Sequence, residues 1–233
     1  MMQAAPSLLR RTLGLAATAC TLALPLGAQG SIGAALTTSV GPLTRDPAGF
    51  QSFGQSFTAP TFASRLTSFS LSFSSFFNGG ALTFDAYVYG FSTATQSITG
   101  PALWSQLDVA GSANEFDFDT RTFNTGDLQL GSGGTYLFLI TTSNQGAVPM
   151  DAANLVGAND TDDYSGGAFW IAGNGDDAGA LASPGAFMSV AGITDAAFAA
   201  TLVTPEPASI VLMGTGLLVL GAVSRRRSRG RRS

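Results

Sequence analysis

The sequence predicts an all-β fold: an antiparallel β-sandwich, jelly-roll-like, flanked by an N-terminal signal peptide and a C-terminal single transmembrane helix. Three observations lead to this prediction. Apolar and polar residues alternate with period two through the middle of the chain, as in half-buried strands. Clusters of Gly, Asn, Ser and Pro separate the alternating segments, as turns do. Helical periodicity is weak between residues 29 and 204, which favours two packed sheets.

The first 28 residues have the three parts of a secretory signal peptide. Arg10 and Arg11 give a positive start, residues 12–26 are apolar, and small residues precede a predicted cut after Ala28. A buried N-terminal helix is one alternative. A lipoprotein attached through Cys20 is another, although the residues before this cysteine fit a lipobox poorly.

We expect the exported passenger, residues 29–204, to begin with a loose Gly- and Thr-rich lead-in over residues 29–48. About nine strands should follow it. Their expected ranges are 51–58, 67–74, 82–89, 102–109, 115–121, 136–140, 167–172, 186–191 and 198–202. The number of strands and the turn clusters between them predict one β-sandwich domain.

Alternation also assigns faces within these strands. In TSFSLSFS, residues 67–74, three large apolar side chains share one face and four serines the other. In residues 82–89, Asp85, Tyr87 and Tyr89 lie opposite the apolar face. In residues 115–121, Phe116 and Phe118 should face the core. Residues 136–140 are apolar on both faces, which predicts a central strand covered on both sides.

Composition limits the chemistry of the passenger. Residues 29–204 hold three Arg, no Lys and 14 Asp and Glu, a net charge of −11, which disfavours a nucleic-acid partner. The chain has no His, and its one cysteine lies in the signal, so the mature part has no disulfide and no soft-metal site. Catalysis by Ser–His–Asp is excluded. We therefore expect a protein that is not an enzyme and needs no cofactor.

Residues 205–233 have three parts in a fixed order. Pro205, Glu206 and Pro207 come first, and the uncharged residues 208–223 follow as the predicted transmembrane helix. A helix of this length covers roughly 24 Å, and snorkelling arginines can extend it toward the roughly 30 Å of a bilayer core. The predicted membrane-stop cluster at the end is Arg225, Arg226, Arg227, Arg229, Arg231 and Arg232. Arginines stay cytoplasmic, which puts the passenger on the far side; an ordinary tail anchor is the alternative.

Together these parts resemble the PEP-CTERM sorting signal, with Thr204 where many members have Val. The resemblance implies export through the inner membrane, cleavage by signal peptidase and an exosortase, and a final place at the cell surface or in the extracellular matrix of a biofilm. Both prolines lack an N–H, so the tripeptide should stay extended and accessible. Residues 54–60, 84–91, 100–104 and 123–139 are similar to the all-β domains ahead of such tails, which mostly lack an assigned activity.

Two acidic loops are candidate calcium sites, because calcium takes six to eight oxygen ligands. The candidate ligands are Asp160, Asp162 and Asp163 with Asn159 in one loop, and Asp176 and Asp177 with Asn174 in the other. Neither loop has the EF-hand spacing, and turn preference alone also explains these residues.

Four aromatic residues are candidates for stacking on an exopolysaccharide: Tyr87, Tyr89, Trp104 and Trp170. A second sheet covering these rings is the alternative. A hydrolase would need two carboxylates at a set separation, and Glu115, Asp117 and Asp119 share one strand face. Their spacing equally marks the solvated face of a half-buried strand.

Overall fold

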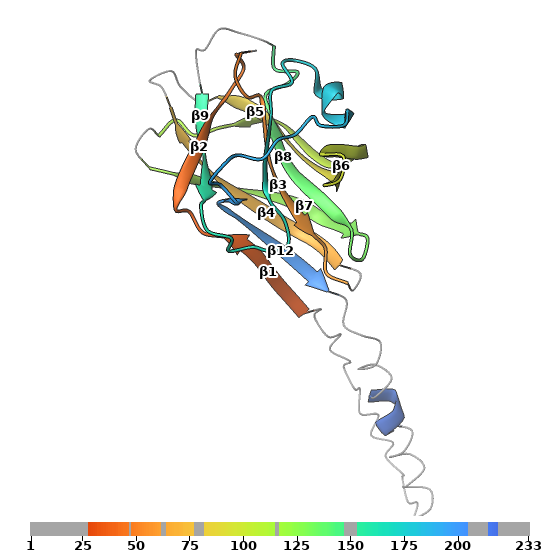
Figure 1. Ribbon diagram of the computed structural model, residues 1–233. Helices are drawn as coiled ribbons and strands as arrows, with labels where there is room; N and C mark the ends of the chain where they lie inside the picture. Colours follow the sequence, from red (N-terminus) through yellow and green to blue (C-terminus); the bar gives the residue numbers. More distant parts are fainter. Residues whose placement is uncertain are drawn as a thin grey trace, which may run out of the picture.

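The computed structural model describes residues 28–46, 48–61, 64–76, 82–114, 117–146, 153–204 and 214–218. Strands make up most of this part of the chain (Figure 1). They are β1 (Ala28–Ala34), β2 (Thr38–Thr44), β3 (Ser52–Thr58), β4 (Ser64–Ser75), β5 (Thr83–Ser92), β6 (Ser97–Ala110), β7 (Asp119–Leu130), β8 (Thr135–Thr141), β9 (Ala153–Asn159), β10 (Phe169–Ala172), β11 (Asp195–Ala196) and β12 (Phe198–Thr204). A 3-10 helix, η1, spans Ala178–Ala182.

The strands form two antiparallel sheets that pack face to face (Figure 1). Sheet A has the order β1-β12-β4-β9-β11, with β7 also paired to β4 and β2 also paired to β9. Sheet B has the order β10-β3-β8-β5-β6. Among the described strands, β5 and β6 are the one pair of sequence neighbours joined in a ladder. Each of the other ladders joins strands that are not consecutive in the sequence, and the predicted all-β antiparallel fold is confirmed.

Aromatic rings fill the space between the sheets. Phe138 of β8 stacks on Phe57 of β3 with 4.1 Å between ring centroids, and on Phe69 of β4 with 4.6 Å. Phe69 also stacks on Phe123 of β7 at 4.8 Å. The predicted inward face of β4 is confirmed, because Phe69, Leu71 and Phe73 are all buried. These contacts tie the two sheets into one core.

The central strand β8 is covered on both sides, as predicted. Its residues 137–140 are fully buried. Phe138 and Ile140 face sheet A, whereas Leu137 and Leu139 belong to a second apolar cluster on the outer face of sheet B. Leu181 and Phe187, from the segment that contains η1 and the residues after it, cover that cluster.

Several boundaries differ from the prediction. Residues 28–34 and 38–44 form β1 and β2 instead of a loose lead-in. Residues 153–159 form β9, which the sequence analysis missed. Residues 186–191 form no strand and contribute one bridge, from Met188 to Ile171. Strand β7 begins at Asp119, so Phe118 precedes it and is half-buried, Phe116 lies outside the described residues, and Phe123 is the aromatic residue of β7 that fills the core.

The predicted export and membrane segments fall mostly outside the described residues. The structure describes residue 28 of the signal and residues 214–218 of the predicted span, which are helical. Within the described part of the chain, no helix is long and apolar enough to cross a membrane.

Candidate functional site

Strands β1 and β12 bring the two ends of the passenger together. They pair antiparallel from Ala28 opposite Thr204 to Ala34 opposite Phe198, side by side at the lower edge of the sandwich in Figure 1. The predicted cut after Ala28 therefore lies beside the last residue before Pro205. The sorting tripeptide, residues 205–207, and the six C-terminal arginines lie outside the described residues.

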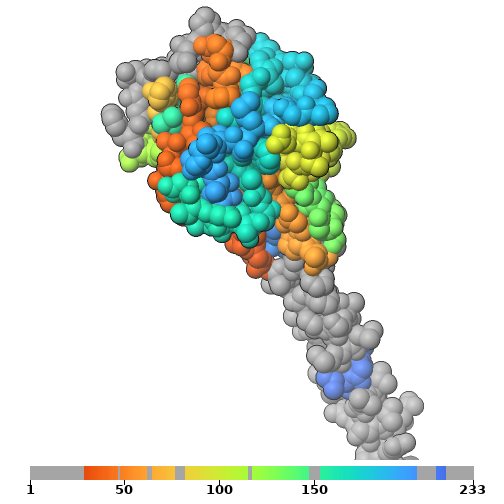
Figure 2. All heavy atoms as spheres, in the orientation of Figure 1, coloured from red at the N-terminus to blue at the C-terminus, as the bar shows by residue number. Residues whose placement is uncertain are grey.

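Four strands of sheet A end at this edge of the domain. Gln29 of β1 pairs with Val203 of β12, Val203 pairs with Arg65 of β4, and Arg65 pairs with Gln129 of β7. We call these four residues the base row. Three of its side chains are exposed and Val203 is half-buried, so the row faces away from the core. Red-orange atoms of β1 reach this narrow end of the folded part in Figure 2.

A tyrosine pair lies on the outer face of sheet B. Tyr87 and Tyr89 of β5 are half-buried, with 5.4 Å between ring centroids and 36° between ring planes. The predicted face of these residues is confirmed. Burial, followed by the nearby Asp85 carboxylate, raises the pKa of both hydroxyls. Both tyrosines therefore stay neutral at physiological pH.

The Asp85 carboxylate is hydrogen-bonded to one member of this pair, Tyr87. Asp85 is 4% exposed, and its carboxylate accepts hydrogen bonds from the Tyr87 hydroxyl at 3.2 Å, the Gln145 side chain at 2.7 Å and the backbone N–H of Asp108 at 3.0 Å. Three donors compensate a buried carboxylate. The result is an aromatic surface bordered by an ordered carboxylate and amide.

The two tryptophans are used in packing. Trp104 of β6 points between the sheets, where its ring meets Phe69 edge-on at 5.5 Å and Phe123 at 6.2 Å. Trp170 of β10 is 7% exposed, contacts Phe91 at 5.2 Å, and donates a 3.0 Å hydrogen bond to Ser56. Trp104 is thus on the opposite face of sheet B from Tyr87 and Tyr89, whereas Trp170 is buried in the outer cluster against which both tyrosines pack.

Side-chain hydrogen bonds stabilise the first acidic loop, residues 159–163. Asn159 donates to Asp163 at 2.9 Å, the Thr161 hydroxyl donates to Asp163 at 2.9 Å, and the Thr37 hydroxyl donates to Asp160 at 2.8 Å. The backbone N–H of Thr161 also donates to the Asn159 side chain at 2.7 Å, which is the hydrogen bond of an Asx turn. In the described part of the chain, no group of three or more His, Cys, Asp or Glu side chains is placed to hold a metal ion.

Asp195 is a buried carboxyl that the sequence analysis missed. It is 0% exposed, and it accepts hydrogen bonds from the Gln55 side chain at 2.8 Å and the Tyr164 N–H at 3.3 Å. Burial raises its pKa, Asp162 and Asp163 add to that rise, and the two hydrogen bonds oppose it. Because Gln55 lies 140 residues away in sequence, local pattern offers no signal for this contact.

The second acidic loop also has a structural arrangement. Asp177 caps η1 by accepting from the N–H of Gly179 and Ala180. Asn174 accepts from the Ser52 hydroxyl at 2.8 Å and donates to the Ser143 hydroxyl at 2.6 Å. These bonds fasten the segment with η1 to one end of sheet B.

The acidic residues near β7 do not form a facing pair. The Asp119 carboxylate accepts a 2.6 Å hydrogen bond from the Ser112 hydroxyl, whereas Asp117 is exposed in the preceding loop. Glu115 lies outside the described residues. The two described carboxylates are therefore in different settings, one bonded and one solvated.

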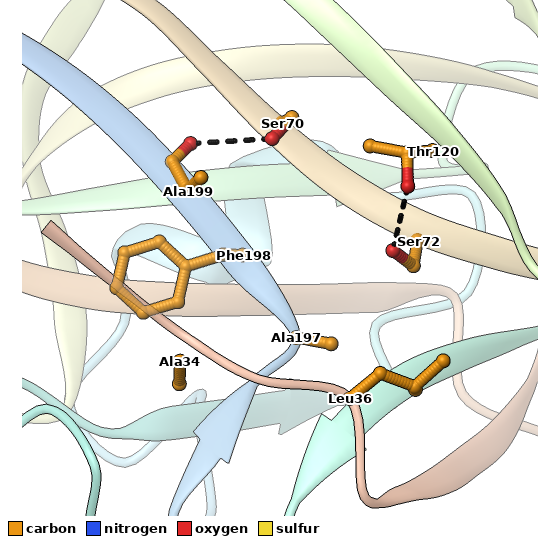
Figure 3. A pocket seen from close by; sticks show the side chains of 8 residues that line it. All are labelled: Ala34, Leu36, Ser70, Ser72, Thr120, Ala197, Phe198 and Ala199. Carbon is orange, nitrogen blue, oxygen red and sulfur yellow. Dashed lines mark hydrogen bonds between the residues drawn. The ribbon is translucent and has the colours of Figure 1, made fainter. Parts of the chain in front are cut away.

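A small depression lies on the outer face of sheet A (Figure 3). Its volume is about 170 Å³, below the roughly 300–1,000 Å³ of typical ligand pockets. Leu36 and Phe198 lie at two sides, and the Ser72 and Thr120 hydroxyls are bonded to each other at 3.2 Å. The lining is Ala34, Leu36, Ser70, Ser72, Thr120, Ala197, Phe198 and Ala199. The depression thus offers neither charge nor room for an organic substrate.

Comparison with known families identifies one segment. Residues 203–227 match the family described as the PEP-CTERM protein-sorting motif. The C-terminal segment of the chain carries a PEP-CTERM protein-sorting motif. The match starts at Val203, so the PEP-CTERM motif overlaps the last two residues of β12. The motif implies exosortase-dependent export to the cell surface or the extracellular space, with an exosortase as the processing partner.

The passenger itself is less similar to known proteins. No curated protein matches the chain. One solved structure holds the cysteine protease and lectin-like domains of Cwp84, a surface layer associated protein of Clostridium difficile (14% identity, TM-score 0.40, 66% of this chain and 32% of that one). Another is a clostridial cysteine protease, Cwp84, after propeptide cleavage (14% identity, TM-score 0.43, 76% of this chain and 40% of that one). A third is the structure of infectious bursal disease virus, Gx strain (15% identity, TM-score 0.33, 85% of this chain and 48% of that one). The chain spans about a third to a half of the length of these structures.

Proposed function

We propose that this chain is an exosortase substrate whose non-enzymatic β-sandwich passenger is delivered to the cell surface or the extracellular matrix. The observation that carries the proposal is the place of the sorting motif: it begins where the last core strand ends. The folded passenger is thus complete before the tripeptide and the apolar segment. Signal peptidase removes residues 1–28, and the exosortase removes the end with the arginines.

The passenger's chemistry supports a non-enzymatic role. Residues 29–204 contain no His, Lys or Cys, which leaves carboxylates as the main candidates for a general base. The buried hydroxyls of Ser52, Thr141 and Ser143 bond to one another and to Asn174. No described base activates them, so this cluster stabilises one end of sheet B.

The mature mass of the protein from its native host tests the proposal. We expect a form that lacks both ends, released from the membrane. A variant with residues 205–207 replaced by alanines should stay in the membrane with its arginine-rich end attached. Extracellular protein that still carries that end would contradict the proposal.

A second candidate function for the passenger is polysaccharide binding at the tyrosine pair. Tyr87 and Tyr89 lie on the outer face of sheet B, beside the bonded Asp85 and Gln145 side chains. Sugars stack on aromatic rings, and carboxylates and amides bond to their hydroxyls. Leu103 and Leu107 of the adjacent edge strand are 44% and 58% exposed, and alternation from Ser105, the register partner of Tyr87, puts them on the same face.

Glycan-array binding by mature protein purified from the host tests this candidate. Tyr87→Ala and Tyr89→Ala should each lower glycan binding, because a stacking ring is lost. Tyr87→Phe keeps the ring and should retain most binding. Phe76→Ala, which removes an exposed ring next to sheet A, is the matched control and should bind as the parent does. Equal binding by all four variants would eliminate the tyrosine pair as the site.

A further inference from the structure

Very little chain separates the folded passenger from the membrane segment. Strand β12 ends at Thr204, and the apolar residues begin at Ala208. The three residues between them span roughly 10 Å when extended, at about 3.3–3.6 Å per residue. A single helix with its side chains is roughly 10–12 Å wide. An enzyme that closes around residues 205–207 therefore has no space to avoid the end of sheet A.

The base row is the outward surface at that end. It crosses four strands at Gln29, Val203, Arg65 and Gln129, in one register. Because β12 lies between β1 and β4, Val203, two positions before Pro205 in the sequence, has Gln29 on one side and Arg65 on the other. The row thus flanks β12 on both sides, within two residues of the start of the sorting tripeptide in the sequence.

Charge also distinguishes this end of the domain. Residues 29–204 carry a net charge of −11 with three arginines, and Arg65 is the charged member of the base row. Asp127 is the single acidic residue within the described strand ends 29–31, 64–67, 127–130 and 201–204. This end therefore approaches an anionic membrane surface with less repulsion than the rest of the passenger does.

We propose that the base row is part of the surface that the exosortase contacts when it acts on residues 205–207. In this contact Arg65 supplies the positive charge, and Gln29 of β1 contacts the enzyme on the other side of β12. The enzyme thereby recognises a folded strand end in addition to the linear motif. This inference rests on the proposed function above.

Processing of the full chain in an exosortase-containing host tests the inference. Arg65→Glu should slow removal of the C-terminal end about threefold to tenfold, as expected for reversal of a contact charge. Arg121→Glu is the matched control, since it makes the same change in net charge at the opposite end of sheet A, opposite Leu71. Thermal unfolding of both variants separates a processing defect from a folding defect.

A second variant leaves the folded residues untouched. Eight Gly and Ser residues inserted between Thr204 and Pro205 have a root-mean-square length of about 15 Å, enough to separate the tripeptide from the base row. We expect this insertion alone to slow processing, and Arg65→Glu to add no further loss in its presence.

The outcomes distinguish the two proposals. Parental processing rates for Arg65→Glu or for the insertion would overturn the inference, while the exosortase-substrate function stands as long as the alanine variant of residues 205–207 stays uncleaved. A loss caused by Arg65→Glu that persists in the insertion background would also overturn it, since Arg65 would then act on lipid headgroups or elsewhere. Cleavage of the alanine variant would instead remove the proposed function.

Discussion

Gly33 provides a way to separate β1 from β12 without touching the sorting motif. A Cβ atom at this position would meet the carbonyl oxygen of Phe198 at 2.4 Å, 0.6 Å short of the 3.0 Å that real Cβ contacts require. Its other close neighbours, at 3.1 and 3.3 Å, are also backbone atoms of β12. Backbone cannot rotate away as a side chain can, so the two strands must move apart.

We expect Gly33→Ala to lower the free energy of unfolding by about 1–3 kcal/mol, the usual cost of overpacking. Gly30→Ala is the matched control in the same strand, because its nearest atom is the Leu202 carbonyl oxygen at 4.0 Å. That change should be neutral or stabilise by up to about 1 kcal/mol, since alanine restricts the unfolded chain. Urea unfolding of the mature protein measures both values. Unfolding free energies within about 0.5 kcal/mol of each other would refute the reasoning.

Three further predictions concern the core, the buried carboxyl and calcium. Phe138→Ala should lower the free energy of unfolding by about 3–5 kcal/mol in urea, because its ring stacks on Phe57 of the same sheet and on Phe69 of the facing sheet; a loss under about 1 kcal/mol would argue against that packing. The raised pKa of Asp195 means that the folded protein holds this proton more tightly than the unfolded chain, whose value is 3.8. Its contribution to stability is therefore full below pH 3.8 and declines as pH rises through the raised value, and Asp195→Asn should remove this decline from the pH–stability curve. Millimolar calcium should leave the thermal midpoint unchanged, since a ligand that stabilises must bind the native state, and a clear rise would show that an acidic loop holds the ion.

Alternation in the sequence was enough for the strands that pack their large side chains inward. Together with the turn clusters between segments, it located β3, β4, β5, β6, β8, β10 and β12 to within a few residues; in β4, Phe and Leu at every second position leave little choice of face. It failed for β9, in which Asn154 and Asn159 are typical turn residues. There, both side chains are fully buried and both amide nitrogens are bonded: Asn154 donates to the Ser74 and Ser112 carbonyls, and Asn159 donates to the Ala35 carbonyl. These partners are distant in sequence, so tertiary contacts decided the outcome over local propensity.

The residues of the candidate site also fall into two groups: those that a linear motif reveals and those that only the fold brings together. The sorting tripeptide and the arginine cluster are linear signals, and a family match covers residues 203–227. The base row is not a linear signal, because Gln29, Arg65 and Gln129 become neighbours of Val203 only through register. Likewise, Asp85, Tyr87 and Tyr89 could be assigned to one face from spacing alone, whereas the bond from Gln145 to Asp85 required the fold.

The position of β12 implies that the passenger cannot complete its fold until the last residues before the sorting motif have been exported. This strand lies between β1 and β4 in sheet A and buries Phe198, Ala200 and Leu202. Its removal would break two ladders and open the core from one side. Burial of a large apolar side chain contributes about 1.5–3 kcal/mol, and whole domains are stable by only about 5–15 kcal/mol. A chain ending at residue 197 should therefore show no cooperative unfolding transition, whereas one ending at residue 204 should unfold cooperatively. Circular dichroism during urea titration distinguishes them. Cooperative unfolding of the shorter chain would show that sheet A does not depend on β12, and that folding can finish before the sorting motif reaches the membrane.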